Sequence, residues 1–452
     1  MSIKYLYLKK NRICIEMRFI DLFVKLVESK YDSLLRIITE PDEKIEFYHG
    51  LIEKYWYSLP TIKTLQHGCI HAVDSSDAII ELAGGGIIYI VRSASISNHK
   101  DELREIYLDA FYPKFTEDLN EYRRLMREHL EHKVALKAAK NLGKDDVILI
   151  DGSIFGRMSH VFVPINIPER EDFMISYVES FHKLLKTCVE NRILLVGVAK
   201  DSRSTLLKEA LLTKLLFEKI SNYDMEIKLK IGNILPIIHR DPRKAIKLIE
   251  EMQGQIGAEI IDILKELLDP LPDSKIIIST GLEAGYSHPL KLTLKNLVRG
   301  LIEGIFKPEI RSEIARKFAD KLPSNANQNN EMRVQRALEY MASYPPVESF
   351  YVKFKENDLP LRVDVVHEKI YELKTQDKIS FINGDWEEIT ANVISILNQL
   401  YAGLRNYNVL LTLVDNYVKF RREYKDKYKS MMEKILGRLI EQSRGARRVS
   451  FP

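Results

Sequence analysis

The chain has 452 residues, of which 45% are hydrophobic and 29% charged, with a formal net charge of +4. This length allows two or three domains of roughly 100–200 residues, and the composition supports a large core and excludes a wholly disordered chain. Three cysteines at unrelated positions (Cys14, Cys69 and Cys188) exclude a disulfide framework and a cysteine-rich zinc module. We therefore expect a reducing, cytoplasmic setting. No membrane association is expected, because no apolar run approaches the roughly 18 residues of a membrane span.

The first 60 residues predict an N-terminal helical arm. Apolar residues such as Phe19, Leu22 and Leu26 recur at helical spacing, which indicates helix over 17–57. Pro60 closes the arm.

Residues 61–220 predict the core of an α/β protein. Short apolar runs predict strands at 69–73, 87–91, 104–112, 147–150 and 193–199, and helical periodicity predicts helices at 116–140, 171–190 and 203–220. The first three strands have tight connections and should be antiparallel, whereas the later ones alternate with helices and should be parallel. We therefore expect a mixed sheet flanked by helices.

Residues 221–345 are helix-rich and predict a helical insertion, with a β-like run at 275–279 and a polar loop at 323–331. The chain then returns to the core at 346–452, with strands at 349–354 and 361–366 and helices at 387–403 and 408–440. Its last 34 residues hold eleven Lys or Arg residues and four acidic ones. This basic C-terminal helix suits a polyanion, although a solvated helix face would have the same composition.

Two aspartates follow buried strands. Asp74 follows the apolar run 69–73 and lies within Ala-Val-Asp-Ser-Ser, and Asp151 opens Asp-Gly-Ser. Carboxylates at neighbouring strand ends can converge, and oxygen ligands of this kind suit Mg²⁺ or Mn²⁺. Two such ions can assist phosphodiester hydrolysis. The alternative interpretation is structural, because an aspartate after a strand is often a turn residue or a helix N-cap.

Four short motifs in order resemble the archaeal and bacterial NurA nucleases: the segments around Asp74 and Asp151, Val-Gly-Val-Ala-Lys200-Asp-Ser-Arg203, and Arg362-Val-Asp364. The resemblance extends from about residue 45 to 430 and is diffuse between 221 and 345. It implies an RNase H-like core, a homodimer, and a Mn²⁺-dependent DNA nuclease with 5′→3′ exonuclease and single-strand endonuclease activity. It also implies a partner, the hexameric translocase HerA, in the resection of DNA ends.

The resemblance also implies site residues. Asp74 and Asp151 match metal-binding aspartates, and Glu131 matches the helix glutamate, with Glu128 as the fallback. Tyr407 matches the late tyrosine, but Asp415 stands where the family commonly has histidine. An aspartate can ligate the second metal, yet it is a poorer general acid than histidine at neutral pH.

DNA contacts are expected from basic residues. Lys200 could hold a phosphate near the metals, or it could be a surface residue that opens the helix at 203–220. Arg203 resembles the arginine of the family motif, and Arg123 and Arg127 on the helix at 116–140 could neutralise phosphates.

We therefore predict a DNA nuclease with two Mn²⁺ or Mg²⁺ ions held by Asp74, Glu131, Asp151 and Asp415, with Tyr407 positioning the substrate. Two rival functions remain. One is a catalytically weakened DNA-binding partner of the translocase, and the other is a ribonuclease on the same fold.

Overall fold

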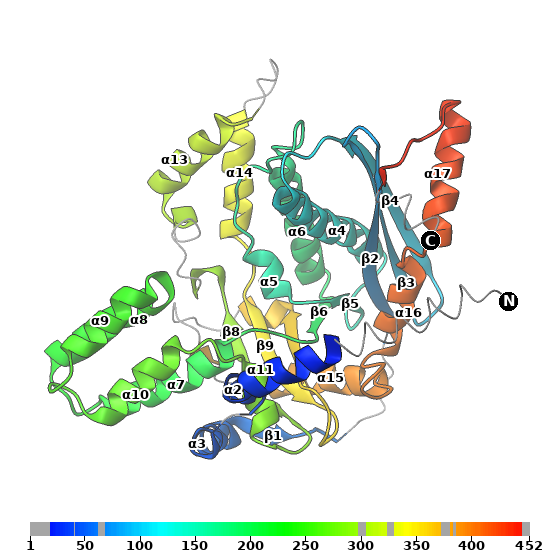
Figure 1. Ribbon diagram of the computed structural model, residues 1–452. Helices are drawn as coiled ribbons and strands as arrows, with labels where there is room; N and C mark the ends of the chain where they lie inside the picture. The colour runs from blue at the N-terminus through cyan, green and yellow to red at the C-terminus, as the bar shows by residue number, and fades with distance from the viewer. Residues whose placement is uncertain are drawn as a thin grey trace.

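The computed structural model describes residues 19–39, 41–61, 68–296, 304–322, 330–371, 380–382 and 386–444. These residues form one mixed β-sheet with helices packed on both of its faces (Figure 1). The predicted α/β class is confirmed.

Five strands form the part of the sheet that holds Asp74 and Asp151: β2 (Ile70–Glu81), β3 (Ile87–Ser97), β4 (Glu102–Phe111), β5 (Val147–Asp151) and β6 (Leu194–Ala199). Their order across the sheet is β4-β3-β2-β5-β6. The first three strands are antiparallel, as predicted, while β5 pairs parallel with β2 and β6 pairs parallel with β5. This order and these directions are those of an RNase H-like sheet, so the predicted fold is confirmed.

The sheet continues past β6 with shorter antiparallel strands: β10 (Leu361–Val366), β9 (Val347–Lys353), β7 (Gly285–Ser287), β1 (Trp56–Ser58), β8 (Leu290–Leu292) and β11 (Ser380–Phe381). Within the described residues the sheet holds eleven strands. The segment predicted as a helical insertion thus also supplies two strands, β7 and β8, to the central sheet. The domain boundaries themselves stay a prediction.

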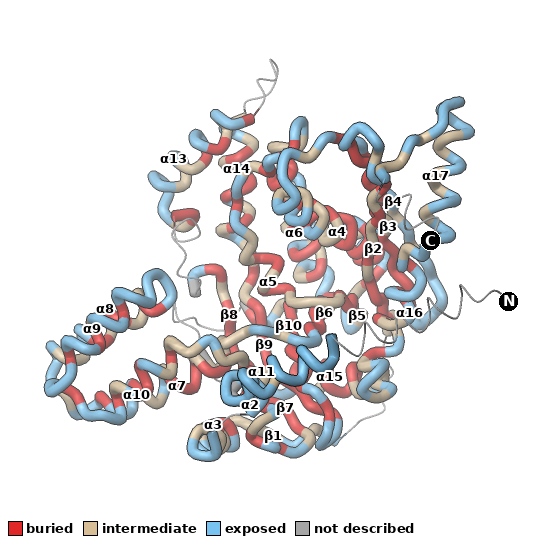
Figure 2. Tube along the Cα trace, viewed as in Figure 1, coloured by how far each residue is buried: buried red, intermediate tan, exposed pale blue. Residues whose placement is uncertain are grey.

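Each face of the sheet has its own core, because side chains alternate across a strand. On one face the core includes α4 (Thr116–Ala139), α5 (Ile154–Met158), α6 (Phe173–Glu190), α13 (Pro308–Ala319) and α14 (Asn330–Ala342). On the other face it includes α15 (Glu387–Gln399) and α16 (Val409–Val418). Figure 2 shows most of the central strands and the sides of these helices that face them as buried, whereas the edge strand β4 is largely exposed or half-buried.

A group of helices projects from the sheet: α7 (Leu206–Lys219), α8 (Met225–Arg240), α9 (Pro242–Glu251) and α10 (Ala258–Leu268) (Figure 1). They share a third apolar core. We call these four helices the lobe. Helix α7 belongs to two cores, because Leu207 and Leu211 pack in the main core whereas Leu212 and Leu216 pack in the core of the lobe.

The strand predicted at 275–279 is wrong, since this run lies in helix α11 (Asp273–Ser279). The run of three isoleucines suggests a strand, but Pro272 precedes the helix and Asp273 accepts hydrogen bonds from the backbone N–H groups of Leu207 and Lys208. These contacts fix a helical turn that local β propensity does not anticipate.

Two long predicted helices are broken. The arm contains helical residues 19–29, α2 (Tyr31–Ile38) and α3 (Asp42–Ile52), with Pro41 before α3, then the 3₁₀ turn η1 (Glu53–Tyr55). The helix predicted at 408–440 is two helices, α16 and α17 (Arg422–Leu436), and α17 has no buried residue. Two further 3₁₀ turns are η2 (Leu294–Asn296) and η3 (Glu368–Tyr371).

Most of the polar loop predicted at 323–331 lies outside the described residues. No helix in the described part of the chain is long and apolar enough to cross a membrane.

Candidate metal centre

Asp151 ends β5, and Asp74 lies beside it within β2, where the parallel pairing of the two strands stops. The strand predicted to end at residue 73 is wrong in its end, because β2 continues to Glu81 through its pairing with β3. The last registered pair of β2 and β5 is Val73 with Ile150, so the two aspartates follow directly, one on each strand. Adjacent strands lie about 4.8 Å apart, and the residues two positions earlier on both strands pack beneath α15 and α16. The two carboxylates therefore begin as neighbours on the same face of the sheet.

The turn after Asp151 requires glycine at two positions. Gly152 has φ +106, a left-handed conformation that favours glycine. Gly197 on β6 lies so close to the turn that a Cβ atom there would stand 2.6 Å from the carbonyl oxygen of Gly152. Ser153 then caps α5, since its Oγ accepts a hydrogen bond from the backbone N–H of Gly156 at 2.8 Å. The Asp-Gly-Ser element is thus both a turn with a helix cap and the carrier of Asp151.

Asp364 of the Arg362-Val-Asp364 motif anchors this turn by hydrogen bonds. Asp364 is fully buried, and its Oδ2 accepts hydrogen bonds from Ser153 Oγ at 2.5 Å and from the backbone N–H of Phe155 at 3.0 Å. Its other oxygen accepts from Ser349 Oγ at 2.7 Å and from Arg362 Nε at 3.1 Å. The motif therefore positions the segment after Asp151. The spacing of Arg362 and Asp364 on one strand face could have predicted the ion pair, but not its target.

Helix α16 brings Tyr407 and Asp415 to the two aspartates. It begins at Asn408, whose Oδ1 accepts a hydrogen bond from the backbone N–H of Leu411 at 3.0 Å. The Tyr407 hydroxyl donates a hydrogen bond to Asp151, and burial together with the charges of Asp151 and Asp74 raises the pKa of Tyr407 well above its ordinary value. Asp415 is exposed on α16.

Asp74 carries the clearest electrostatic signature of the cluster. Burial, then the charge of Glu131, then the charges of Asp151 and Asp415 raise its pKa to about 8, against a hydrogen bond from the backbone N–H of Ser75. Four carboxylates therefore act on one another here, and like charges this close disfavour ionisation. A divalent cation would restore the ionised form by neutralising the surplus negative charge.

The donor set fits a hard divalent cation. The carboxylates and the Tyr407 hydroxyl that meet here offer oxygen, as Mg²⁺ and Mn²⁺ prefer. No three acidic, histidine or cysteine side chains of the described residues already converge on a single ion position. Mg²⁺ is usually held by one or two carboxylates with water and substrate phosphates, so Asp74 and Asp151 suffice as protein ligands.

Lys200 provides a positive charge at the cluster. It follows β6, and its Nζ lies 3.0 Å from Asp151 Oδ2 and 5.0 Å from the centre of the Tyr407 ring. Burial lowers the pKa of Lys200, but the charge and hydrogen bond of Asp151 outweigh it and raise the pKa. The lysine therefore lies at the cluster, as one of its two predicted interpretations requires.

Glu131 lies close to the two strand ends but is held by other groups. One carboxylate oxygen accepts from Ser75 Oγ and the other pairs with Arg157, and both charged side chains are buried. Arg157 also donates to the backbone carbonyl of Asp151 at 3.2 Å. A role as a metal ligand would require Glu131 to share or exchange these contacts. The role of Arg157 as the partner of Glu131 was not predicted, because nothing in the sequence around Arg157 indicates a partner on α4.

The fallback residue Glu128 is similarly engaged. It accepts hydrogen bonds from His160 Nε2 at 2.7 Å and from the Tyr177 hydroxyl at 2.5 Å. Burial raises its pKa, but the hydrogen bond of His160 and the charge of Arg157 outweigh it and lower the pKa to about 2. Glu128, Arg157 and His160 line a hollow of about 480 Å³ that reaches Asp151.

The arginines expected to contact DNA have different surroundings. Arg123 Nε lies 2.6 Å from Asp77 Oδ2, and Arg127 Nε lies 3.6 Å from Asp77 Oδ1. Asp77 therefore partly neutralises both, and they are not at the metal cluster. Arg203 is exposed in the segment between β6 and α7.

The sheet order and the neighbouring carboxylates of Asp74 and Asp151 define an RNase H-like protein with an acidic candidate metal centre. The chain belongs to the NurA family, since the family model described as the NurA domain matches residues 69–420. No curated protein sequence matches the chain significantly.

One solved structure agrees on the fold, and two others are similar over most of their length. The crystal structure of the NurA nuclease from Sulfolobus solfataricus is 14% identical, with a TM-score of 0.53, over 92% of this chain and 97% of that chain. A structure of NurA with manganese is 16% identical, with a TM-score of 0.39, over 90% of this chain and 98% of the other. A structure of NurA bound to dAMP and manganese is 18% identical, with a TM-score of 0.37, over 90% and 95%.

Proposed function

We propose that this chain is a divalent-metal-dependent deoxyribonuclease that hydrolyses DNA phosphodiester bonds. The observation that carries the proposal is the placement of Asp74 and Asp151 side by side where the parallel pairing of β2 and β5 stops, with Asp415 and Tyr407 brought to them by α16. Membership of the NurA family supports the same reaction, because the Sulfolobus solfataricus relative is described as a nuclease.

Asp74 and Asp151 would hold the cation, with Asp415 and Glu131 as further ligands for two Mn²⁺ or Mg²⁺ ions. When bound, such ions would stabilise the charge that develops on the phosphate and on the leaving oxygen. Lys200 would exchange its contact with Asp151 for a phosphate oxygen of the substrate. The Tyr407 hydroxyl keeps Asp151 oriented. Proton delivery would fall to solvent water, because a carboxylate that ligates a cation has no proton to donate.

The finer properties of the proposal rest on the resemblance to NurA nucleases. They are 5′→3′ exonuclease and single-strand endonuclease activity, a homodimer, a cytoplasmic location, and action with a HerA-type hexameric translocase in the resection of DNA ends. Arg203, Arg123 and Arg127 would contribute to the electrostatic attraction of DNA.

One observation favours a second function. Lys200 occupies one oxygen of Asp151, and Asp415 replaces the histidine that the family commonly has. A chain whose acidic cluster is neutralised in this way could bind DNA for the translocase without cutting it. A ribonuclease is the other alternative, because carboxylate–metal chemistry does not select the sugar.

The test is cleavage of end-labelled single-stranded and duplex DNA, and of the same sequences as RNA, with Mn²⁺, Mg²⁺ or EDTA. We expect DNA cleavage that requires the cation and is lost in Asp74→Asn and Asp151→Asn. Asp320→Asn, at an exposed site at the end of α13, is the matched control and should retain activity. Cation-dependent cleavage that survives in both site variants would refute the site. DNA binding without any cleavage would establish the DNA-binding function, and cleavage of RNA alone would establish a ribonuclease.

A further inference from the structure

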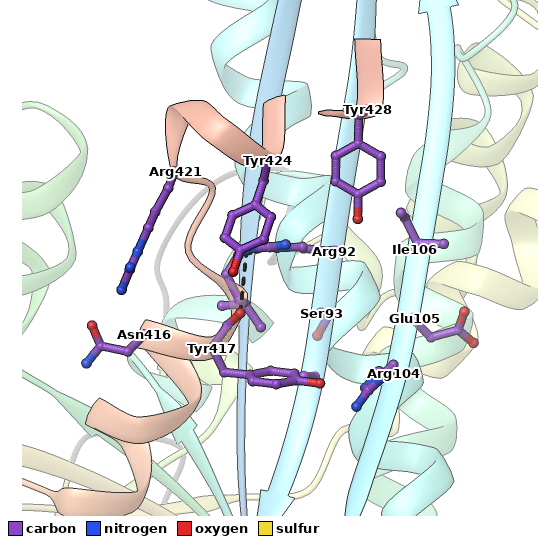
Figure 3. A pocket seen from close by; sticks show the side chains of 12 residues that line it. Arg92, Ser93, Arg104, Glu105, Ile106, Asn416, Tyr417, Arg421, Tyr424 and Tyr428 are labelled. Carbon is purple, nitrogen blue, oxygen red and sulfur yellow. Dashed lines mark hydrogen bonds between the residues drawn. The ribbon is translucent and has the colours of Figure 1, made fainter. Parts of the chain in front are cut away.

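A groove lies beside the candidate metal centre, on the same face of the sheet. It has a volume of about 640 Å³ and is bounded by β3, β4, the end of α16 and the start of α17 (Figure 3). Aromatic and guanidinium groups dominate its lining, which includes Arg92, Arg104, Tyr417, Arg421, Tyr424 and Tyr428. The volume is within the range of about 300–1,000 Å³ that is typical of ligand pockets.

Arg92 orders the floor of the groove by binding backbone carbonyl groups at the end of α16. The Nε of this side chain donates to the carbonyl of Val418 at 2.5 Å, and Nη2 donates to the carbonyl of Lys419 at 2.6 Å, so Arg92 satisfies the end of α16. The guanidinium lies 4.8 Å from the ring centre of Tyr424 and 4.4 Å from that of Phe420. Cation–π contacts of this kind orient the ring of Tyr424.

A second arginine and tyrosine are similarly arranged. Arg104 lies 5.4 Å from the ring centre of Tyr417, whose hydroxyl donates to Glu102 at 3.1 Å. Tyr428 contacts Phe420 with ring centres 5.7 Å apart. Figure 3 shows the tyrosines of α16 and α17 placed around one space over the strands. Ordered aromatic rings around a cavity suit planar ligands such as nucleobases.

The charge of the groove suits an anion. Arg421 is exposed and lines it, and α17 adds Lys425 and Lys427, whereas Lys429 is paired with Glu433 at 3.7 Å. Two further lining residues are already paired, Glu105 with Lys137 at 2.6 Å and Arg104 with Glu102. Phosphates would therefore meet chiefly the positive charge of Arg421 while bases meet the rings, a combination that is typical of single-strand binding channels.

The groove is adjacent to the proposed catalytic cluster along the chain. Asp415 belongs to the cluster, and the next residues, Asn416 and Tyr417, line the groove. All three are exposed on α16. A strand whose phosphate lies at Asp74 and Asp151 could thus pass over α16 into the groove.

We propose that this groove binds single-stranded nucleic acid next to the candidate metal centre, with Tyr424 and Tyr428 stacking on bases and Arg421 contacting a phosphate. The proposal rests on the proposed nuclease function for the identity of the ligand. The three arginines and three tyrosines of the lining favour a nucleic acid. The exposed apolar side chains of Ile106 and Leu108 on β4 and of Ile435 on α17 would instead suit a second copy of this chain, which the second test distinguishes.

The first test measures binding of a fluorescein-labelled oligothymidine to the full chain in EDTA, by anisotropy over a range of salt concentrations. Tyr428→Ala should weaken binding roughly tenfold through lost stacking, and Tyr428→Phe should retain it. Arg421→Ala should make the slope of log affinity against log salt shallower by about 0.7. The matched controls Tyr31→Ala on α2 and Arg316→Ala on α13 should bind as the parent chain does.

The second test uses oligonucleotides that carry 5-iododeoxyuridine, which crosslinks to aromatic side chains on irradiation. Crosslinks mapped to Tyr424 or Tyr428 would support the groove, and crosslinks confined to other segments would overturn it. Unchanged DNA affinity in Tyr428→Ala and Arg421→Ala, together with a change from dimer to monomer, would also overturn it in favour of an interface between copies.

The outcomes separate the two proposals. A chain that crosslinks in the groove and cuts nothing would refute the nuclease and leave the groove as a nucleic-acid site. A chain that cuts DNA with a cation, but whose groove variants bind as the controls do, would refute the groove alone.

Discussion

Lys200 Nζ lies 3.0 Å from Asp151 Oδ2, so the candidate metal centre already contains one positive charge on one of its principal carboxylates. The ammonium group occupies an oxygen that a cation would use. This single contact gives Lys200 two opposite effects, since it competes with the cation and can bind the substrate phosphate.

Lys200→Met should therefore separate these effects. Removing the positive charge should tighten Mn²⁺ binding in the absence of DNA several-fold, because the cation no longer displaces an ion-paired ammonium. Cleavage should slow and the KM for DNA should rise. Calorimetry with Mn²⁺ and steady-state kinetics check the two results. Lys186→Met, at an exposed lysine on α6, is the control, and weaker Mn²⁺ binding in Lys200→Met would contradict the competition.

Asp74→Asn should stabilise the metal-free protein increasingly as the pH rises. The pKa of Asp74 is raised to about 8, so between the unfolded pKa near 3.8 and pH 8 the unfolded chain ionises and the folded chain does not. The stability that Asp74 contributes is therefore complete below about pH 4 and is lost as the pH rises toward 8.

The asparagine variant lacks this loss, so its advantage over the parent should grow from pH 4 to pH 8, to a few kcal/mol at most. Thermal melting in EDTA at several pH values measures it. Adding Mn²⁺ at pH 8 should make the parent more stable than Asp74→Asn, because the cation binds the parent more tightly. A pH-independent difference would exclude the raised pKa.

The buried pair of Arg157 and Glu131 should be essential to stability. Arg157→Met leaves Glu131 buried without its counter-charge, which typically costs about 3–5 kcal/mol. The double variant Arg157→Met with Glu131→Gln should recover much of this loss, because no charge is then stranded. Urea unfolding of the parent, Arg157→Met, Glu131→Gln and the double variant gives the free energies of unfolding for this double-mutant cycle. Arg124→Met, whose ion pair with Glu121 is exposed, should change stability by less than about 0.5 kcal/mol.

Gly197→Ala should impair the site more than the fold. The new methyl group would meet the carbonyl oxygen of Gly152 at 2.6 Å and a side-chain atom of Ile154 at 2.9 Å, so the turn that carries Asp151 must shift. A displacement of about 1 Å at a catalytic group can cost around a hundredfold in rate. Gly232→Ala, in open space on α8, should leave activity intact and stabilise the helix by about 0.5–1 kcal/mol. Equal activities in the two variants would refute the role of Gly197.

The central strands and the position of Asp151 at the end of β5 could be predicted because they depend on local patterns, whereas Asp74 lies inside β2, whose second half is defined by pairing with β3. A short apolar run ended by Asp-Ser or Asp-Gly-Ser is readable from a few adjacent residues. The three-residue strands β1 and β7 were not predicted, because they are defined by pairing with each other rather than by their own sequences.

Contacts between distant segments could not be predicted. The pairing of Glu131 with Arg157 and of Ser153 with Asp364 depends on how α4, α5 and β10 pack. The helix break between Val418 and Arg422, which opens the groove, likewise interrupts a pattern that is continuous in sequence. Tertiary context decides such features.

Helix α7 has one end in the main core and the other in the core of the lobe. It starts six residues after Lys200, and the segment 201–205 between them is neither helix nor strand. A protein that binds the lobe would therefore contact the helix that follows Lys200 along the chain. Such binding would place a partner at one end of α7 and the candidate metal centre near the other.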